Sequence, residues 1–236
     1  MSGHSKWATI KRAKGAADVR RGQLFTKLAR GITIVVREGG GDPAMNFKLR
    51  LEIDKARSYN MPKDGIDRAI ARGVGEDKSG VIEEALYEGF GPGNVGMLVA
   101  AATDNKNRSA SDIKHIFSKN NGAIAGSGSV KWQFEQKGVV RVPCALTEEQ
   151  ELALIDAGAD DFKKEEEGTT IYTAVPQFRA VSEAVAKLGL TPADSGLEWV
   201  PKETVAIDDE ARTKLDALRE ALDAHDDVQD IYSNEL

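Results

Sequence analysis

The sequence predicts an α+β protein of several domains: an N-terminal three-helix bundle, a middle α/β domain, and a ferredoxin-like β-α-β-β-α-β domain inserted into the middle domain. Two observations predict this organisation. Apolar residues recur at three- and four-residue steps up to about residue 73, whereas segments typical of strands begin near residue 83. From Val139 onward the expected order is strand, helix, strand, strand, helix, strand, which is a complete ferredoxin-like unit.

Residues 1–75 are expected to form the basic helical domain. The first helix should cover 16–37, where an apolar face lies opposite a basic face. The apolar set is Leu24, Phe25, Leu28, Ile32, Val35 and Val36, and the basic set is Arg20, Lys27, Arg30 and Arg37. Asp42-Pro43 should cap and begin a second helix that runs to about Tyr59. Met61-Pro62 opens a third, which stops at Gly73, and 74–80 is expected to be a linker.

The middle domain is expected in two pieces, 81–137 and 203–236. Strands at 83–90 and 95–103 flank a turn at 91–94, and Ser109 with Asp112 predicts a capping box for a helix to about Asn120. Val130, Trp132 and Phe134 alternate with polar residues, which predicts a half-buried strand turned at Lys137-Gly138. The tail should add a strand at 203–207, a helix at 209–223 and a strand at 228–233. Because two strands alone bury too little surface, they should rejoin the sheet begun at residue 83.

The inserted domain is expected at 138–202. After the strand from Val139, Thr147 and Gln150 predict a capped helix at 147–157. The remaining elements are strands at 161–167 and 169–174, a helix at 177–188 and a strand at 194–200. This domain and the tail (203–236) are acidic, whereas residues 1–75, called the head below, are basic.

Charge divides the chain by position. Residues 1–75 contain 16 Lys and Arg against 7 Asp and Glu, whereas residues 76–236 contain 16 basic against 31 acidic residues. Nine of the basic residues precede Glu38, with Asp18 as the one acid among them. A basic segment of this kind indicates a polyanionic partner, most often nucleic acid, bound through the release of condensed counterions. A solvated helix face is the alternative, but such a face usually carries interleaved acids.

The rest of the composition indicates what class of protein this is and which kinds of site it lacks. A 236-residue chain with 41% hydrophobic and 30% charged residues is typical of a soluble globular protein. The single cysteine, Cys144, fits a reducing compartment, and with three scattered histidines it leaves no metal-ligand spacing. The N-terminus lacks an apolar h-region and the longest apolar run, 95–102, is too short to span a bilayer. We therefore expect a cytoplasmic protein without membrane association, secretory signal, cofactor or metal.

Several short motifs have a structural and a functional interpretation. Gly91 to Gly96 matches GxGxxG, but a strand follows it, so a hairpin turn explains it better than a dinucleotide site. Ser109, Asp112 and His115 lack the geometry of a catalytic triad, which predicts no enzyme activity and no small-molecule substrate. The 104–108 segment is either an anion site or a capped loop, and Gly126 to Ser129 is a flexible loop that could approach a partner. Trp7 either stacks on an unpaired base or anchors the N-terminal segment to the bundle.

Motifs along the whole chain resemble the YebC family, which includes the mitochondrial translational activator of cytochrome c oxidase. The matching segments are GHSKW (3–7), GQLFTKL (22–28), NMPKDGIDRAI (60–70), YEGFGPG (87–93), TDNKNR (103–108), FSKNNG (117–122), GSVKWQFEQKG (128–138) and DDVQDIY (226–232). The resemblance implies three domains, with the third inserted into the second, and a non-enzymatic role in gene expression. Bacterial members are commonly labelled probable transcriptional regulators that bind DNA, and the family is also linked to ribosomes that stall at proline runs.

We favour the translational role, with ribosomal RNA as partner, over DNA-binding transcriptional regulation. No helix-turn-helix spacing with a base-reading helix is evident, and the sequence pI of about 5.3 is unusual for a dedicated DNA-binding protein. The residues expected to contact nucleic acid are the basic residues of the first 37 positions, together with His4 and Trp7 and with two basic residues that follow the second predicted strand of the middle domain. They are His4, Lys6, Trp7, Lys11, Arg12, Lys14, Arg20, Arg21, Lys27, Arg30, Arg37, Lys106 and Arg108.

Overall fold

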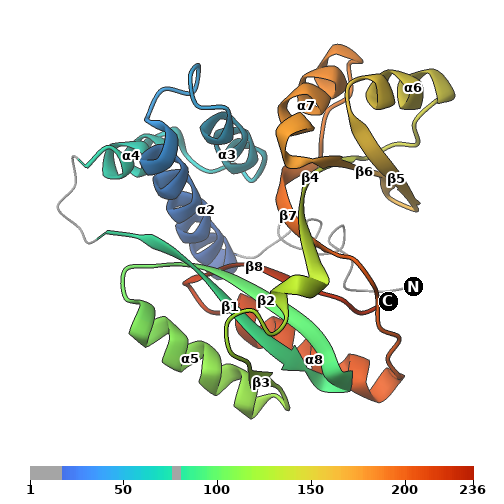
Figure 1. Ribbon diagram of the computed structural model, residues 1–236. Helices are drawn as coiled ribbons and strands as arrows, with labels where there is room; N and C mark the ends of the chain where they lie inside the picture. Colours follow the sequence, from blue (N-terminus) through green and yellow to red (C-terminus); the bar gives the residue numbers. More distant parts are fainter. Residues whose placement is uncertain (1–17, 76–80) are drawn as a thin grey trace. The chain divides into compact units, whose positions relative to one another are not determined.

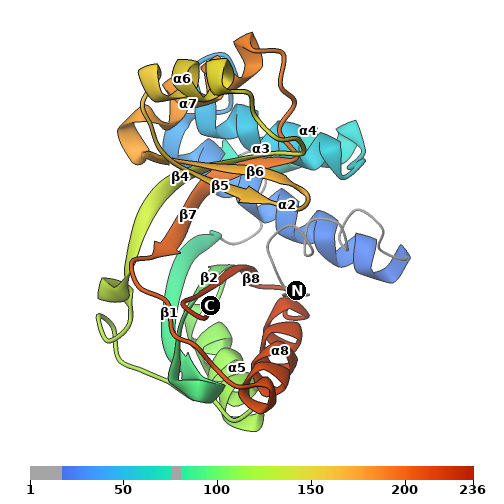
Figure 2. The same ribbon diagram turned by 90° about the vertical axis from the view of Figure 1, so that its right-hand side faces the viewer.

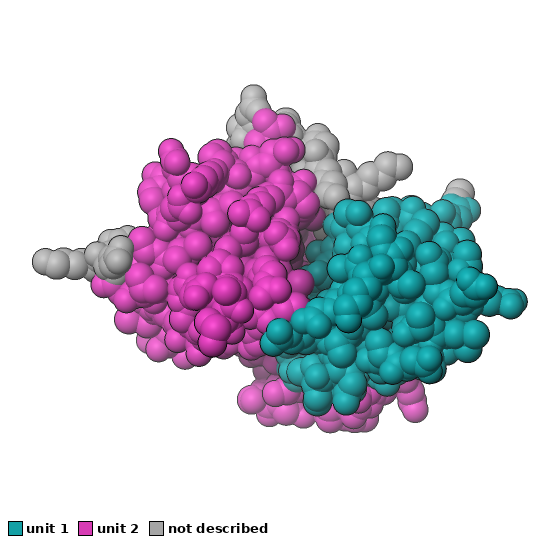
Figure 3. Space-filling view, turned by 90° about the horizontal axis from the view of Figure 1, so that it is seen from above, with its two compact units in different colours: residues 1–14, 136–200 teal, residues 15–135, 201–236 magenta. Residues whose placement is uncertain are grey.

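A computed structural model describes residues 18–75 and 81–236 (Figure 1). The predicted fold class is confirmed: a helical bundle precedes two four-stranded antiparallel sheets with their helices. The described chain divides into two compact units, shown in different colours in Figure 3. One comprises residues 136–200, and the other comprises 18–135 with 201–236. The two units are described separately below.

The bundle consists of α2 (Asp18–Gly39), α3 (Phe47–Ser58) and α4 (Lys63–Gly73). Its core joins Leu28 and Ile32 of α2 to Leu49 and Ile53 of α3 and Ile66 of α4. The prediction that Asp42-Pro43 begins the second helix is wrong, because Asn46 caps α3 instead. The buried Asn46 side chain accepts from the Leu49 N–H and donates to the carbonyls of Val35 and Gly40, so it fixes α3 against the end of α2.

The first sheet has the order β3-β1-β2-β8, with β1 at Glu83–Gly91, β2 at Val95–Thr103, β3 at Ala123–Ile124 and β8 at Val228–Ser233. Strand β2 is central and almost wholly buried, as its apolar sequence predicts. Helices α5 (Lys106–Lys119) and α8 (Asp209–Asp223) cover one face of the sheet, and α2 lies on the opposite side (Figure 2). Met97, Val99 and Ala101 face α5 and α8, whereas Ala102 packs with Ile34 of α2.

The C-terminal tail completes this sheet, which confirms that it rejoins the strands begun at residue 83. Strand β8 pairs antiparallel with β2, with Ile231 opposite Val99. The predicted strand at 203–207 is wrong, however: only Val205 forms a bridge, with Glu235. Ile207 packs on the core and against Gly93 in the β1–β2 turn, so this segment covers the turn instead of extending a ladder.

The predicted strand at 130–134, with a turn at Lys137-Gly138, is also wrong. Lys131–Gln133 form a single 3₁₀ turn, η2, and β4 then runs without interruption from Phe134 to Val142. Two backbone N–H groups at the start of η2 bond to the Glu88 carboxylate and are therefore not available to a strand ladder. Gly138 lies within β4 because the Phe178 ring packs directly on it, where a Cβ atom would lie 2.5 Å from that ring.

The unit formed by 136–200 has the strand order β5-β6-β4-β7, which is the ferredoxin-like order. Its further elements are β5 (Ala159–Glu165), β6 (Gly168–Ala174), β7 (Asp194–Pro201), α6 (Glu148–Asp156) and α7 (Phe178–Lys187). The predicted capping box of Thr147 and Gln150 begins α6. Arg141 is buried and forms a bidentate pair with Glu198, which ties β4 to β7.

Truncation of Leu218 should test the role of the tail in the core. Leu218 on α8 is fully buried beneath the first sheet, so Leu218→Ala should lower the free energy of unfolding by about 2–5 kcal/mol. Leu152→Ala makes the same chemical change on α6, where the side chain is 62% exposed, and should cost less than about 0.5 kcal/mol. Urea unfolding of both variants checks this. Equal losses would show that α8 does not anchor the sheet.

Candidate nucleic-acid interface

The predicted contact residues divide into two groups. His4, Lys6, Trp7, Lys11, Arg12 and Lys14 lie outside the described residues, and Arg20 lies in α2 without a described side chain. The side chains of Arg21, Lys27, Arg30, Arg37, Lys106 and Arg108 are described. Arg21 is exposed near the start of α2, and Arg37 near its end donates to the Ile82 carbonyl.

Lys27 and Arg30 do not lie on a free face of α2. Lys27 Nζ lies 2.9 Å from the Asp223 carboxylate and also donates to the Asp223 carbonyl. Arg30 pairs with Asp227 at 2.6 Å and donates to the Asp226 carbonyl. Both cations therefore attach the helical bundle to the end of α8 and the segment that follows it.

Asp227 is the centre of this attachment. Its side chain is only 3% exposed, and one carboxylate oxygen accepts from Arg30 of α2. The other accepts from Ser109 at 2.5 Å and from Thr103 and Arg108, both at 3.1 Å. The backbone carbonyl of Asp227 also accepts from the Ala102 N–H at the end of β2. One buried carboxylate thus joins α2, β2, α5 and the start of β8.

These bonds determine the charge state of Asp227. Burial alone would raise the pKa of this carboxyl, but the hydrogen bonds from Ser109, Arg108 and Thr103 and the charge of Arg30 outweigh it. Together they lower the pKa of Asp227 to about 2. The carboxylate therefore stays ionised throughout the physiological range.

The capped-loop interpretation of 104–108 is confirmed for its first half, because Asp104 and Asn105 join β2 to α5, whereas Lys106 to Arg108 form the first turn of α5. Asn105 caps α5 by accepting from the Arg108 N–H, so the predicted capping box of Ser109 and Asp112 is wrong. Ser109 instead lies inside the first turns of α5, fully buried, because its hydroxyl is needed by Asp227. Lys106 pairs with Glu83, and Arg108 pairs with both Asp104 and Asp227. The positive charge of this segment is therefore largely compensated.

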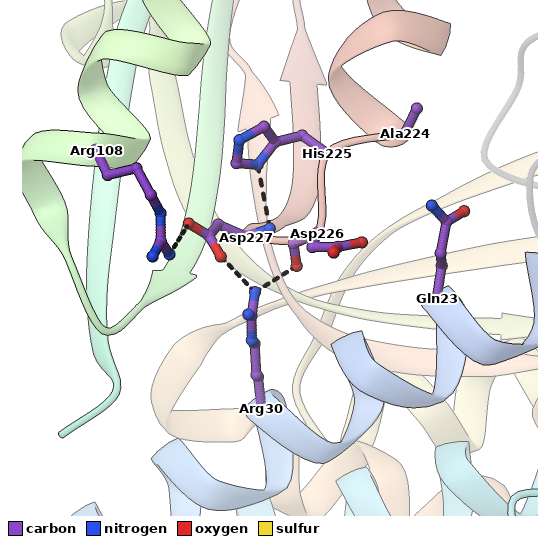
Figure 4. A pocket seen from close by; sticks show the side chains of 7 residues that line it. All are labelled: Gln23, Arg30, Arg108, Ala224, His225, Asp226 and Asp227. Atoms are coloured by element: carbon purple, nitrogen blue, oxygen red, sulfur yellow. Dashed lines mark hydrogen bonds and ion pairs between the residues drawn. The ribbon is translucent and has the colours of Figure 1, made fainter. Parts of the chain in front are cut away.

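A cleft of about 500 Å³ opens beside this cluster (Figure 4). Its lining residues are Gln23, Arg30, Arg108, Ala224, His225, Asp226 and Asp227. His225 Nδ1 accepts from the Asp227 N–H, and its Nε2 lies 3.4 Å from Asp112. With two arginines opposed by two aspartates, the cleft has no strong excess of either charge and does not form a phosphate site.

The sequence did not predict that Asp227 joins the bundle to the first sheet. An aspartate within an acidic tail gives no sign that its partner, Arg30, lies 197 residues earlier. Among the described residues, no cluster of His, Cys, Asp and Glu is suited to hold a metal ion. A search of the same residues finds no helix with the length and apolar character needed to cross a membrane.

Comparisons with known proteins place these features in one family. Residues 5–76 match the family described as the TACO1/YebC protein N-terminal domain, and residues 82–235 match the TACO1/YebC second and third domain. A "probable transcriptional regulatory protein" of Chloroflexus aggregans is 50% identical over 99% of this chain and 95% of its own length. One from Dehalococcoides mccartyi is 47% identical over 99% and 94%. The crystal structure of a conserved hypothetical protein, Aq1575 of Aquifex aeolicus, has a TM-score of 0.89 at 41% identity, covering 98% of this chain and 97% of that one.

Asp227→Asn should change how the free energy of unfolding depends on pH in the acid range. Because the folded pKa of about 2 lies below the ordinary value of 3.8, the contribution is complete above about pH 5 and is lost as pH falls towards 2. The stability difference between the natural protein and Asp227→Asn should be constant above about pH 5 and shrink by about 2 kcal/mol as pH falls to 2. Urea titrations at a series of pH values measure this difference, from which other carboxylates largely cancel. A difference that stays constant down to pH 2 would contradict the assignment.

Proposed function

Because the chain belongs to the TACO1/YebC family, we propose that it regulates gene expression as a non-enzymatic, ribosome-associated translation factor. Its basic N-terminal domain binds ribosomal RNA, and this binding relieves stalling at difficult sequences such as proline runs. The names of the relatives support a regulator of gene expression in general. The choice of ribosomal RNA and the site of contact rest on the charge distribution.

The observation that carries the proposal is the distribution of basic residues within the head. Residues 1–37 contain nine Lys and Arg against one acid. Lys27 and Arg30 are occupied by Asp223 and Asp227, and Arg37 is bonded to a carbonyl. The other basic residues of this segment lie before Gly22: Lys6, Lys11, Arg12, Lys14, Arg20 and Arg21. A short basic segment of this kind suits a narrow RNA cavity, because it needs no extended complementary surface.

The alternative is a DNA-binding transcriptional regulator, the activity that the relatives' names carry. Such a protein needs a helix whose side chains read base edges in the major groove. Helix α4 exposes Asp64 and Asp67 beside Lys63 and Arg68, and these carboxylates would be repelled by a phosphate backbone. Helix α2 is unsuitable because it packs on α3, α4 and the first sheet. These features favour RNA over duplex DNA.

A competition experiment tests the choice of partner. The protein is offered purified ribosomes together with a pool of random DNA duplexes at physiological salt, and the retained nucleic acid is sequenced. We expect ribosomal RNA to be retained and no duplex sequence to be enriched. Enrichment of one defined duplex motif would contradict the translational role and support the transcriptional one.

The site of contact is tested with two charge-reversed variants. Lys11, Arg12 and Lys14 are changed to Glu in one variant, and the exposed Lys114, Lys119 and Lys187 are changed to Glu in the other. Both change the net charge equally. We expect only the first to lose ribosome binding and to reduce the salt dependence of the remaining affinity. Equal losses would show that net charge, and not the N-terminal segment, governs binding.

A further inference from the structure

Trp132 is exposed in a way that the sequence does not predict. Its alternation with Val130 and Phe134 predicts an inward-facing side chain, yet Trp132 is 67% exposed whereas Val130 and Phe134 are buried. A single exposed tryptophan is not unusual when it is loosely held at a surface. The surroundings of Trp132, however, hold it in one place.

The backbone on either side of the indole is fixed by a buried carboxylate. Glu88 on β1 is 4% exposed and accepts from the N–H groups of Gly128, Val130 and Lys131, at 2.6–2.8 Å. Burial would raise the pKa of Glu88, but these three bonds together lower it, so the carboxylate is charged and its bonds are strong. One of these bonds holds Gly128, within the 126–129 loop.

The indole itself is also oriented. Trp132 Nε1 donates to the Ser129 carbonyl at 3.0 Å, which satisfies the one polar group of the ring. Lys202 donates from Nζ to the Trp132 carbonyl and from its backbone N–H to the Gln133 carbonyl. Neighbouring residues leave the ring uncrowded, since Gly126, Ser127, Gly128 and Ser129 are small and exposed. An aromatic ring is thus held rigidly with its hydrogen-bond donor already used.

Such a ring can recognise a partner only through its apolar surface. Lys131 adjoins Trp132 in the chain, Lys202 Nζ donates to the Trp132 backbone carbonyl, and both lysines are exposed. An aromatic face flanked by lysines is the arrangement that binds single-stranded nucleic acid, where the base stacks on the ring and the cations meet the backbone phosphates. A hydrophobic protein partner would not be favoured by the two flanking charges.

We propose that Trp132 is a stacking platform for an unpaired nucleotide base of RNA, with the positive charges of Lys131 and Lys202 nearby. This second contact lies in the middle domain, outside the basic head, and it rests on the proposed function in so far as the partner is RNA. Because the indole N–H is occupied, the platform should accept any base and show little sequence preference.

The test uses the full chain and a short, fluorescein-labelled oligouridine RNA. Trp132→Ala should weaken binding roughly tenfold, the ordinary cost of losing one base–aromatic stack, whereas Trp132→Phe should retain most of the affinity. Trp199→Phe, a change of the same kind in the 136–200 unit, should bind like the natural protein. The exposed position of Trp132 means that folding should be unaffected, which circular dichroism and thermal unfolding verify.

A second readout follows the indole directly. With Trp7 changed to Phe in every protein compared, addition of the RNA should quench tryptophan fluorescence in the parent and in Trp199→Phe, and the quenching should be largely lost in Trp132→Phe. The proposal is overturned if folded Trp132→Ala binds the RNA as the natural protein does while reversal of Lys11, Arg12 and Lys14 still abolishes binding. In that case the proposed function stands without this platform.

Other outcomes also decide the matter. If Trp132→Ala leaves RNA affinity unchanged but weakens binding to intact ribosomes, the ring contacts a protein, and the nucleotide platform is overturned. If the natural protein binds neither the RNA nor ribosomes, the proposed function fails together with this inference. If only Trp132→Ala and not Trp132→Phe loses affinity, with quenching specific to Trp132, the platform is supported.

Discussion

The buried carboxylate of Asp227 is the interaction on which the arrangement of the larger unit depends. It receives hydrogen bonds from Arg30, Thr103, Arg108 and Ser109, which belong to three separate elements. Removing one partner of a buried ion pair typically costs about 3–5 kcal/mol, because the other charge stays buried without compensation. Arg30 is 18% exposed at its side chain and Asp227 3%, whereas the Asp223 partner of Lys27 is 69% exposed. The Arg30 pair should therefore contribute more than the Lys27 pair.

This use of Arg30 and Lys27 divides the basic head into two functions. Cations in the middle of α2 bind the acidic tail of the same chain, whereas we propose that the basic residues before Gly22 meet the nucleic acid. The acidic body thus provides specific partners for the head as well as general repulsion of polyanions. A nucleic acid that competed for Arg30 would have to displace the buried carboxylate of Asp227, at a cost in free energy.

Elements with strong periodicity could be predicted from the sequence almost to the residue, as α8 and β8 show. Their apolar residues fall at regular steps, and clear capping or turn residues bound them. Two of the errors arose where a distant side chain binds local hydrogen-bonding groups. Glu88 captures the N–H groups at 130 and 131 and converts an expected strand into a 3₁₀ turn, and Asp227 draws Ser109 away from a capping position. Neither contact leaves a local pattern, because the partners lie 42 and 118 residues apart. Because the Glu88 contact leaves no local pattern, the alternation of Trp132 with Val130 and Phe134 wrongly predicted an inward-facing side chain.

The coupling between Arg30 and Asp227 is the most direct test of this arrangement. A double-mutant cycle with Arg30→Ala, Asp227→Asn and the combined variant isolates their interaction from the other contacts of each residue. If the pair attaches the bundle to the sheet, the free energies of unfolding should be non-additive by at least about 1 kcal/mol, with the double variant less destabilised than the sum of the single ones. Additivity within about 0.5 kcal/mol would contradict the central role of Asp227 and return Arg30 to the set of residues available for RNA.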